Sequence, residues 1–293
     1  MLRATSWTAS RIRRAPLSAF AVLAITFSWL VWIPAAVLVP DLAVVAVVLG
    51  AFGPAVAGAV VVAATGGGLR AWLRDMAVWR IPARWWLAAL LLPLVIPLAR
   101  VFVLVGTDEP LLLEQSLARL PTFLAATAVT ALVFGGQEEL GWRGYLLPRL
   151  QRRVGPLAAS LLIGALWAAW HLPGYLLPQG VVGGPFVGQP FWIYLAFVMG
   201  LSVAFTWLYN GTRGSVLVCM VLHGAVNNAA LLTPADPSLL DDPGAAPAIN
   251  LAPAVATPAL AVLLLLLGRR WLRRPALRPD TTGVEVGDTA TRR

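Results

Sequence analysis

Eight long apolar stretches, separated by short segments that hold most of the charges, recur along this 293-residue chain. A membrane-spanning helix needs about 20 predominantly apolar residues. The stretches cover residues 16–39, 42–64, 85–105, 121 onward, 156–177, 191–209, 215–232 and 253–268. Each is apolar around its whole circumference, and in hydrocarbon only a helix satisfies its own backbone. We therefore expect an all-α fold, a polytopic membrane helix bundle of about eight transmembrane helices.

Composition supports the membrane class. Hydrophobic residues make up 59% of the chain and charged residues only 12%, with a mean hydropathy of +0.79, whereas a soluble domain is about one quarter charged. The single cysteine, Cys219, excludes an internal disulfide and a metal site built from several cysteines. The first apolar stretch is much longer than the core of a signal peptide, so we expect a retained helix.

All 22 basic residues are arginines, and they concentrate in every second connection. Arginine-rich segments lie within residues 1–15, 65–84, 143–153, 210–214 and 269–293. The alternate connections contain only Arg119. Because cytoplasmic loops carry the excess of Lys and Arg, both termini are expected in the cytoplasm. A nucleic-acid-binding protein would gather its arginines on one face instead, so no nucleic-acid partner is expected.

The same pattern defines the expected domain organisation. Residues 1–268 form one multi-span membrane domain, and residues 269–293 form a polar, disordered cytoplasmic tail. The absence of lysine and the abundance of Ala, Arg, Val and Pro are typical of a GC-rich bacterial genome. We expect a multi-pass protein of the bacterial plasma membrane, with the lipid bilayer as its surroundings and an oligomeric state that the sequence leaves open.

Ionisable residues within the apolar stretches are candidates for function, because insertion of each costs a few kcal/mol. They are Arg100, Glu138, Glu139, Arg143, His171 and His223. We expect Arg100 to reach toward the membrane interface or to pair locally.

The segment "EELGWR" holds two adjacent acids and an arginine. Glu139 and Arg143 are four residues apart and share one helix face, which suits an ion pair. Glu138 points about 100° away, since successive helical residues turn by that angle. We therefore expect Arg143 to neutralise Glu139 and Glu138 to face a cavity as a base. A purely structural Glu139–Arg143 pair is the alternative.

Two further helices supply the remaining polar groups. Trp167 and His171 share a face in "WAAWH", and His223 and Asn227 share a face in "HGAVN". If these helices converge on Glu138, the two histidines could bind Zn²⁺ with an open position for water, or the groups could orient a water directly. The alternatives are histidines that hydrogen-bond between helices and a tryptophan that only packs.

In these three motifs the chain resembles the CPBP family of intramembrane proteases, which includes the CAAX prenyl endopeptidases of Rce1 type and the Abi bacteriocin-immunity proteins. The family motifs E-E-x-x-x-R, F-x-x-x-H and H-x-x-x-N correspond to Glu138–Arg143, to Trp167–His171 with Trp in place of Phe, and to His223–Asn227. The resemblance covers about residues 120–232.

The resemblance implies a glutamate-dependent intramembrane metalloendopeptidase that hydrolyses a peptide bond in a membrane-associated substrate, with CAAX-type processing as one possibility. Glu138 would activate water, supported by Glu139, while His171, His223 and Asn227 would bind a metal or stabilise the oxyanion. Arg143 and Trp167 would support the site. We expect it to be accessible from the cytoplasm. The rival hypothesis is a non-enzymatic membrane protein, such as an immunity factor or scaffold, with a structural buried polar network.

The hypothesis carries a geometric condition. Glu138 and His171 meet only if the fourth helix continues to about Pro148, with the carboxylates near its middle, and if the fifth extends past Pro173. Glu138 must lie within about 12 Å of the histidines, because reacting groups must come within hydrogen-bond reach.

Overall fold

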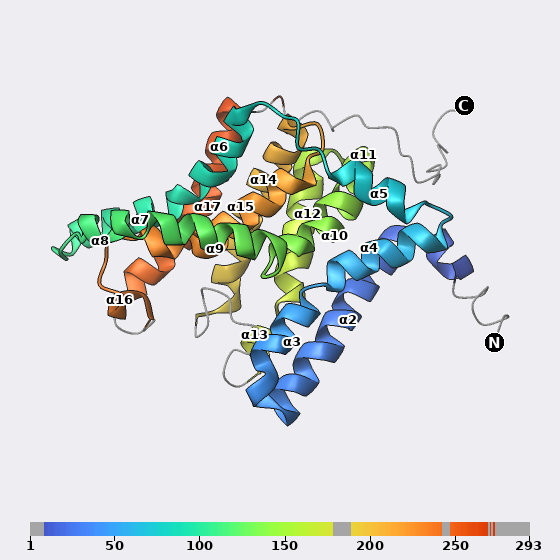
Figure 1. Ribbon diagram of the computed structural model, residues 1–293, viewed down its shortest axis with the longest axis horizontal. Helices are drawn as coiled ribbons and strands as arrows, with labels where there is room; N and C mark the ends of the chain where they lie inside the picture. Colours follow the sequence, from blue (N-terminus) through green and yellow to red (C-terminus); the bar gives the residue numbers. More distant parts are fainter. Residues whose placement is uncertain (1–8, 178–188, 242–246, 269, 271, 273–293) are drawn as a thin grey trace.

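The computed structural model describes residues 9–177, 189–241, 247–268, 270 and 272, and all regular elements in these residues are helices (Figure 1). In chain order they are α2 (Pro16–Leu38), η1 (Pro40–Leu42), α3 (Ala43–Gly50), α4 (Gly53–Ala64), α5 (Leu69–Met76), α6 (Ala83–Leu91), η2 (Leu92–Leu94), α7 (Val95–Gly106), α8 (Leu113–Ala118), α9 (Leu120–Leu132), η3 (Gly136–Glu138), α10 (Glu139–Gly141), η4 (Trp142–Leu146), α11 (Leu147–Val154), α12 (Pro156–Trp170), α13 (Pro173–Leu176), α14 (Phe191–Gly211), α15 (Val216–Asn228), η6 (Ala229–Leu232), α16 (Ser238–Asp241) and α17 (Pro247–Leu267). The all-α prediction is confirmed.

Within the described part of the chain, six helical segments are long and apolar enough to cross a membrane. They are Pro16–Leu38, Val44–Ala64, Ala83–Gly106, Leu120–Val154, Phe191–Gly211 and Pro247–Leu267. The other two expected spans correspond to the shorter apolar helices Pro156–Trp170 and Val216–Leu232. The chain is thus a multi-pass integral membrane protein, and the total of eight crossings stays a prediction. The predicted tail lies outside the described residues except for 270 and 272.

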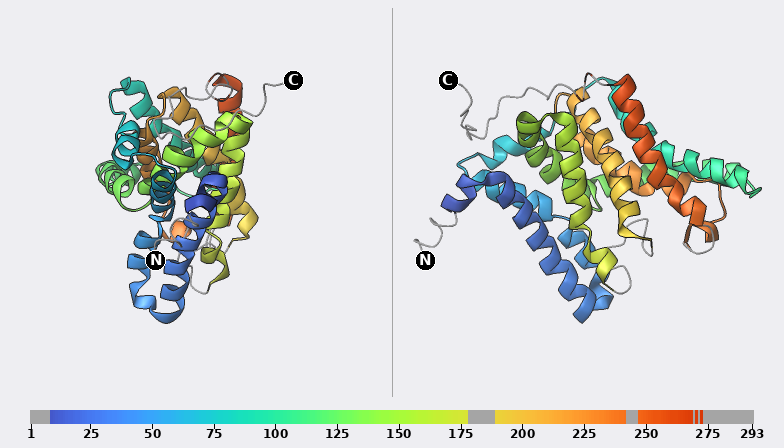
Figure 2. Two further views of the ribbon diagram at one scale, coloured as in Figure 1. Left: turned by 90° about the vertical axis from the view of Figure 1, so that its right-hand side faces the viewer. Right: turned by 180° about the vertical axis from the view of Figure 1, so that it is seen from behind.

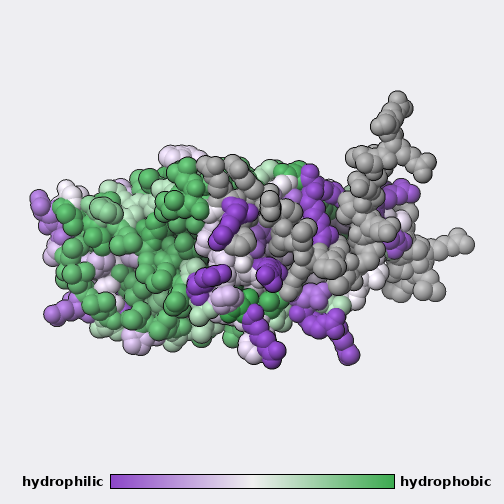
Figure 3. Space-filling view, turned by 90° about the horizontal axis from the view of Figure 1, so that it is seen from above, coloured by the Kyte–Doolittle hydropathy of each residue, from purple (hydrophilic) through white to green (hydrophobic). Residues whose placement is uncertain are grey.

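The exterior of the bundle is apolar. Large side chains such as those of Leu30, Phe102 and Leu267 are exposed on the outer faces of the spans. In the view from above, apolar side chains cover a broad area on the left, and hydrophilic side chains gather toward the right (Figure 3). Extensive exposed apolar surface of this kind is typical of contact with lipid.

Helix α14 is central to the bundle and packs against α12 on one side and α17 on the other (Figure 2). Helix α15 packs against α9. Their close approach occurs at Gly224, where an added Cβ would collide with the carbonyl oxygen of Thr127. Small residues at such contacts allow helix backbones to approach closely in membranes.

The fourth segment continues from α9 through α11 to Val154, as the geometric condition required, but it is not a continuous α-helix. The backbone breaks after α9 at Gly135, whose φ is 142°, and a π-helical turn, η4, follows. Non-helical backbone at membrane depth is tolerated where it is buried in protein or lines a cavity. The predicted long fourth segment with the carboxylates near its middle is confirmed, and the interruption at Gly135 is an addition.

The π-helical turn is held by a tryptophan from another helix. Pro148 has no N–H group, so it cannot donate to the carbonyl of Gly144 as a helical residue would. The indole N–H of Trp72, on α5, donates to that carbonyl at 3.0 Å instead. This bond fastens α5 to the fourth segment just beyond the two glutamates.

The arginine-bearing segments meet at one end of the molecule. Hydrogen bonds join Arg13 to Ala64 O, Ser215 Oγ to Val78 O and Asn210 Nδ2 to Gln151 Oε1. At the opposite end, Ser116 Oγ donates to Leu232 O at 2.6 Å, which joins α8 to the end of η6. This division agrees with the alternation of arginine along the sequence, while the side of the membrane on which each end lies stays a prediction.

Candidate active site

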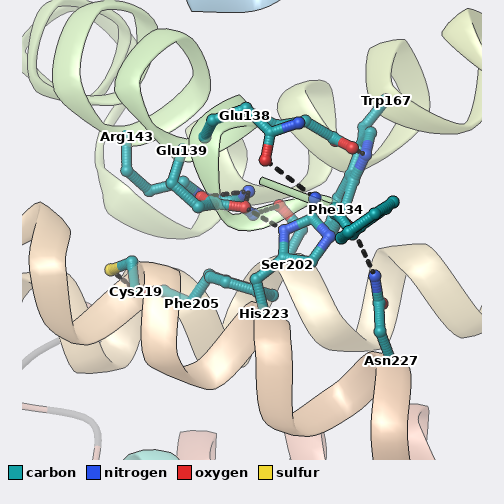
Figure 4. A network of polar contacts seen from close by, with 12 residues as sticks. Phe134, Glu138, Glu139, Arg143, Trp167, Ser202, Phe205, Cys219, His223 and Asn227 are labelled. Atoms are coloured by element: carbon teal, nitrogen blue, oxygen red, sulfur yellow. Dashed lines mark hydrogen bonds and ion pairs between the residues drawn. The ribbon is translucent and has the colours of Figure 1, made fainter. Parts of the chain in front are cut away.

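Glu139 lies between a guanidinium and an imidazole (Figure 4). Arg143 Nη1 donates to both of its carboxylate oxygens, at 3.0 Å and 2.8 Å. Nδ1 of His223 lies 2.8 Å from Glu139 Oε1. The predicted pairing of Glu139 with Arg143 is confirmed, and the contact with His223 is an addition that joins α10 to α15.

Arg143 is enclosed on all sides. Its guanidinium carbon lies 4.9 Å from the ring centroid of Trp167 and 4.1 Å from that of Phe205, and its side chain is fully buried. A second guanidinium nitrogen, Nη2, is 3.5 Å from the hydroxyl of Ser202. Removal of one partner from a buried ion pair costs about 3–5 kcal/mol, because the other charge is left uncompensated. The ion pair between Arg143 and Glu139 therefore stabilises the structure of the site.

Glu138 has a different environment from its neighbour. The indole Nε1–H of Trp167 donates to Glu138 Oε2 at 3.0 Å. That is the one hydrogen bond to the Glu138 side chain from the described residues, and the carboxyl group lines a cavity of about 350 Å³. Trp167 therefore does more than pack against its neighbours, since its N–H orients the carboxyl group of Glu138. The two adjacent glutamates have separate partners, as the helix geometry predicted.

His171 follows the last residue of α12, where Pro173 brings the helix to its end. Its Nδ1 is 3.0 Å from the carbonyl oxygen of Trp167. A carbonyl only accepts, so Nδ1 carries the proton in this bond, and Nε2 of the neutral ring is left with a lone pair. The helix continues beyond Pro173 only as the single turn α13, and His171 also lines the cavity.

His223 and Asn227 lie one helical turn apart on α15 and face the break in the fourth segment. Nδ1 of His223 is taken by Glu139, which directs Nε2 toward Gly135. Asn227 Nδ2 donates to the carbonyl oxygen of Phe134 at 3.3 Å. The amide therefore satisfies a carbonyl that the broken helix leaves open, and it keeps a second N–H for another acceptor.

The predicted residues meet at one place. Trp167 binds Glu138 directly, and its ring centroid lies 6.4 Å from that of His171 and 5.4 Å from that of His223. The Trp167 side chain thus lies next to Glu138 and both histidines. Glu138, Trp167, His171, His223 and Asn227 all line the cavity, whereas Glu139 and Arg143 lie behind this layer.

Two features of the site were not expected from the sequence. Gly135 has no room for a side chain, since a Cβ there would lie 2.6 Å from His223 Nε2 and 2.8 Å from Asn227 Nδ2. The glycine pair at 135 and 136, directly before the acids, was the available signal of a break. Arg100 was expected to reach the interface or to pair locally, and the first of these alternatives is wrong. It is 5% exposed, lines the same cavity and binds Thr233.

The fit to a metal ion depends on the number of available ligands. Catalytic zinc sites use three protein ligands. In His171 and His223 the second ring nitrogen, Nε2, is available as a metal ligand. Glu139 is not available, because it is bound by Arg143 and His223. No group of three or more His, Cys, Asp or Glu side chains in the described residues is arranged to hold a metal. The arrangement is one ligand short of such a site, and zinc binding stays a prediction.

Comparisons with known proteins support the family resemblance of the segment that contains this site. Residues 120–229 match a family described as type II CAAX prenyl endopeptidase Rce1-like. A protein named CAAX prenyl protease 2, from Methanococcus maripaludis, is 32% identical over 93 residues, which are 31% of this chain. The chain thus spans 34% of the length of that relative. The resemblance inferred from the three motifs is confirmed over this segment.

Proposed function

We propose that this chain, a member of the Rce1-like family over residues 120–229, is an intramembrane endopeptidase in which Glu138 activates a water molecule. The observation that carries the proposal is the division between the two glutamates. Glu139 is used by Arg143 and His223, while Glu138 has a single donor, Trp167, and faces the cavity. A carboxylate held in this way is suited to general-base work.

In the proposed reaction, Glu138 takes a proton from a water molecule in the cavity as the water oxygen attacks the peptide carbonyl carbon. The electron pair of the C=O bond moves to the oxygen, which becomes an oxyanion. The free N–H of Asn227 donates to this oxyanion. The intermediate then collapses as the C–N bond breaks, and the proton on Glu138 passes to the leaving amine. His171 Nε2 accepts a hydrogen bond from the attacking water and orients it.

Glu139 acts through His223 in this scheme. Its bond to Nδ1 fixes the imidazole ring and its tautomer beside the reacting groups, as carboxylate–histidine pairs do in other hydrolases. Arg143 balances the charge of Glu139. We therefore assign Glu139 and Arg143 to positioning, and Glu138, His171, His223 and Asn227 to contact with the reacting atoms.

The substrate class we propose is a membrane-associated protein or peptide. The name of the archaeal relative refers to CAAX prenyl processing, so a prenylated peptide with a C-terminal Cys-a-a-X sequence is the first substrate to test. The bacterial character of the composition makes another membrane-associated peptide the second substrate to test.

The decisive experiment compares wild type with Glu138→Gln in liposomes, using a fluorescence-quenched farnesylated peptide. General-base catalysis contributes about 10²–10⁴-fold, so we expect kcat to fall by about that factor with KM little changed. Glu114→Gln, which removes an exposed carboxyl group on α8, is the matched control and should retain activity. Equal activity of Glu138→Gln and wild type would end the assignment.

The rival, a structural network without catalysis, makes a different prediction. It expects no cleavage by wild type and a lower unfolding temperature for Glu138→Gln. Thermal unfolding of the same samples separates the two, because our proposal expects Glu138→Gln to stay folded. Assays with and without a zinc chelator then decide on the metal: loss of cleavage that added Zn²⁺ restores would support a metalloenzyme, and unchanged cleavage would support water activation by Glu138 alone.

A further inference from the structure

Arg100 is a buried charge for which the proposed reaction has no use. It lies on α7, outside the segment matched to the family, and within a span that is otherwise apolar. Its side chain lines the same cavity as Glu138 and is only 5% exposed. An ionisable group buried in a membrane span is a functional candidate by default, and its partner is the first thing to identify.

The described residues leave most of this guanidinium unpaired. One nitrogen, Nη1, donates to the hydroxyl of Thr233 at 3.2 Å, and Nε has no hydrogen-bond partner. No carboxylate of the described residues lies within ion-pair distance of Arg100. Arg143 provides the contrast, since both oxygens of Glu139 receive its Nη1. A guanidinium offers five N–H donors in a planar fork that fits a carboxylate, and the unpaired donors of Arg100 belong to a side chain that lines the cavity.

The position of Arg100 relative to the reacting groups restricts that partner. Thr233, which marks the level of the guanidinium, follows His223 by ten residues along α15 and η6. At a rise of 1.5 Å per residue in α15 and about 2.0 Å per residue in the 3₁₀-helix η6, this is about 17 Å along the helix axis. An extended peptide covers about 3.3–3.6 Å per residue. A carboxylate a few residues from the cleaved bond would therefore reach Arg100.

We propose that Arg100 is the carboxylate-binding subsite of the cavity and takes a carboxylate of the substrate peptide a few residues from the bond that is cut. The inference rests on the proposed function. Ile96 and Pro253, which line the same cavity, are apolar. One charged anchor in an apolar wall fixes the direction and register of a bound peptide, because only one placement pairs the buried charge. The carboxylate belongs either to the free C-terminus or to an acidic side chain.

The test compares peptides with and without a carboxylate at the C-terminal residue. A farnesylated peptide ending in Cys-Val-Leu-Met is prepared as the free acid and as the C-terminal amide, and a third peptide is the amide with Glu as its last residue. We expect wild type to cleave a carboxylate-bearing peptide with a kcat/KM roughly 10-fold or more above the plain amide, as for other charge-assisted hydrogen bonds. Preference for the free acid identifies the terminus as the ligand, and preference for the third peptide identifies the side chain.

The variant Arg100→Gln should abolish this preference by slowing only the carboxylate-bearing peptides, and the plain amide should be cleaved as by wild type. Arg149→Gln is the matched control, because Arg149 is also buried but does not line the cavity. It should keep the preference even if its unfolding temperature falls. A preference that survives Arg100→Gln, or an equal loss for all three peptides, would overturn the proposal.

A binding measurement separates this inference from the proposed function. In the Glu138→Gln background, quenching of the cavity tryptophans Trp32, Trp167 and Trp170 reports peptide binding without cleavage. Tighter binding of the carboxylate-bearing peptide that disappears with Arg100→Gln supports the subsite even if wild type cleaves nothing. Cleavage by wild type without any carboxylate preference, in binding or in rate, leaves the protease intact and removes the subsite.

Discussion

At the scale of single residues, Gly135 controls how closely the reacting groups approach one another. Its φ of 142° is open to glycine and strained for other residues. Its α-carbon also faces the two side chains of α15, where a Cβ would lie 2.6 Å from His223 Nε2. The break in the fourth segment and the position of the His223 imidazole therefore both require that residue 135 has no side chain.

We expect Gly135→Ala to reduce cleavage by about 100-fold, since displacement of a reacting group by about 1 Å can cost that much. Gly155→Ala is the matched control. Gly155 also has a positive φ, 81°, but nothing lies within 4 Å of the position of its Cβ. Backbone strain alone should cost Gly155→Ala about 1–2 kcal/mol of stability and leave kcat intact. Similar activities of the two purified variants would contradict this account of Gly135.

Most polar residues of the site could be predicted from spacing, because residues four apart share a helix face. That rule placed Glu139 with Arg143 and aligned His223 with Asn227. It could not predict the bond from Trp167 to Glu138, which depends on how α12 packs against the fourth segment. Nor could it predict the hydrogen bond from Arg100 to Thr233, which is 133 residues away in the chain.

At the scale of the helices, the contact between α9 and α15 sets the depth of the site. Gly224 lies directly after His223, and its α-carbon rests against the backbone of α9 at Thr127. Asn228 reinforces the contact, because its Nδ2 donates to the hydroxyl of Thr130 at 2.9 Å. A wider spacing here would draw His223 away from Glu139.

Gly224→Ala should therefore lower both stability and activity. We expect a loss of about 1–3 kcal/mol in the free energy of unfolding, the usual cost of overpacking, because the methyl group meets backbone that cannot move aside. Gly106→Ala is the control: Gly106 ends α7, and its Cβ would have open space around it. Thermal unfolding in detergent measures both, and an unaffected Gly224→Ala would show that the helices have room to separate.

Apolar length located all eight helical segments, although the fifth ends at Trp170 rather than at residue 177 and the last begins at Pro247 rather than at residue 253. The interruption at Gly135 and the π-helical turn at Trp142–Leu146 were not predicted, since both depend on tertiary partners that satisfy freed backbone groups. For Gly144 that partner is Trp72, which lies 72 residues earlier in the chain.

At the scale of the whole molecule, the cavity lies toward the end opposite the arginine-bearing segments. Its lining includes Arg100, which is bonded to Thr233, and Ala230 on η6, the helix whose end is joined to α8. Phe134 and Asn227 line it and are exposed, at 48% for Phe134, so the cavity reaches the surface there. If arginine marks the cytoplasmic end, the cavity opens toward the outer side, which differs from the cytoplasmic access expected initially.

Cysteine labelling tests this orientation. Cys219 is the only cysteine and is buried, so Cys219→Ala provides a clean background. In intact cells, a membrane-impermeant maleimide should label Ala230→Cys beside the cavity, and it should label Arg213→Cys only after the cells are permeabilised. Both positions are exposed in the structure. The reverse pattern would place the cavity on the cytoplasmic side.

The distribution of arginines could predict which connections lie at the same end of the molecule, because arginine-rich and arginine-poor connections alternate along the sequence. It could not locate the opening of the cavity, which depends on side chains from segments far apart in sequence. Ala230 and Arg100 are an example, since only the packing of α7 against η6 and α17 brings them to one wall.

The separate origin of Arg100 has an evolutionary consequence. The polar groups of the proposed reaction all come from the continuous stretch that resembles the Rce1-like family, whereas Trp32, Ile96, Arg100 and Pro253 line the same cavity from helices outside it. The chemistry and the choice of substrate can therefore diverge independently. Descendants of such a chain could acquire new substrates by exchanging α7 alone, while the inherited catalytic stretch remained untouched.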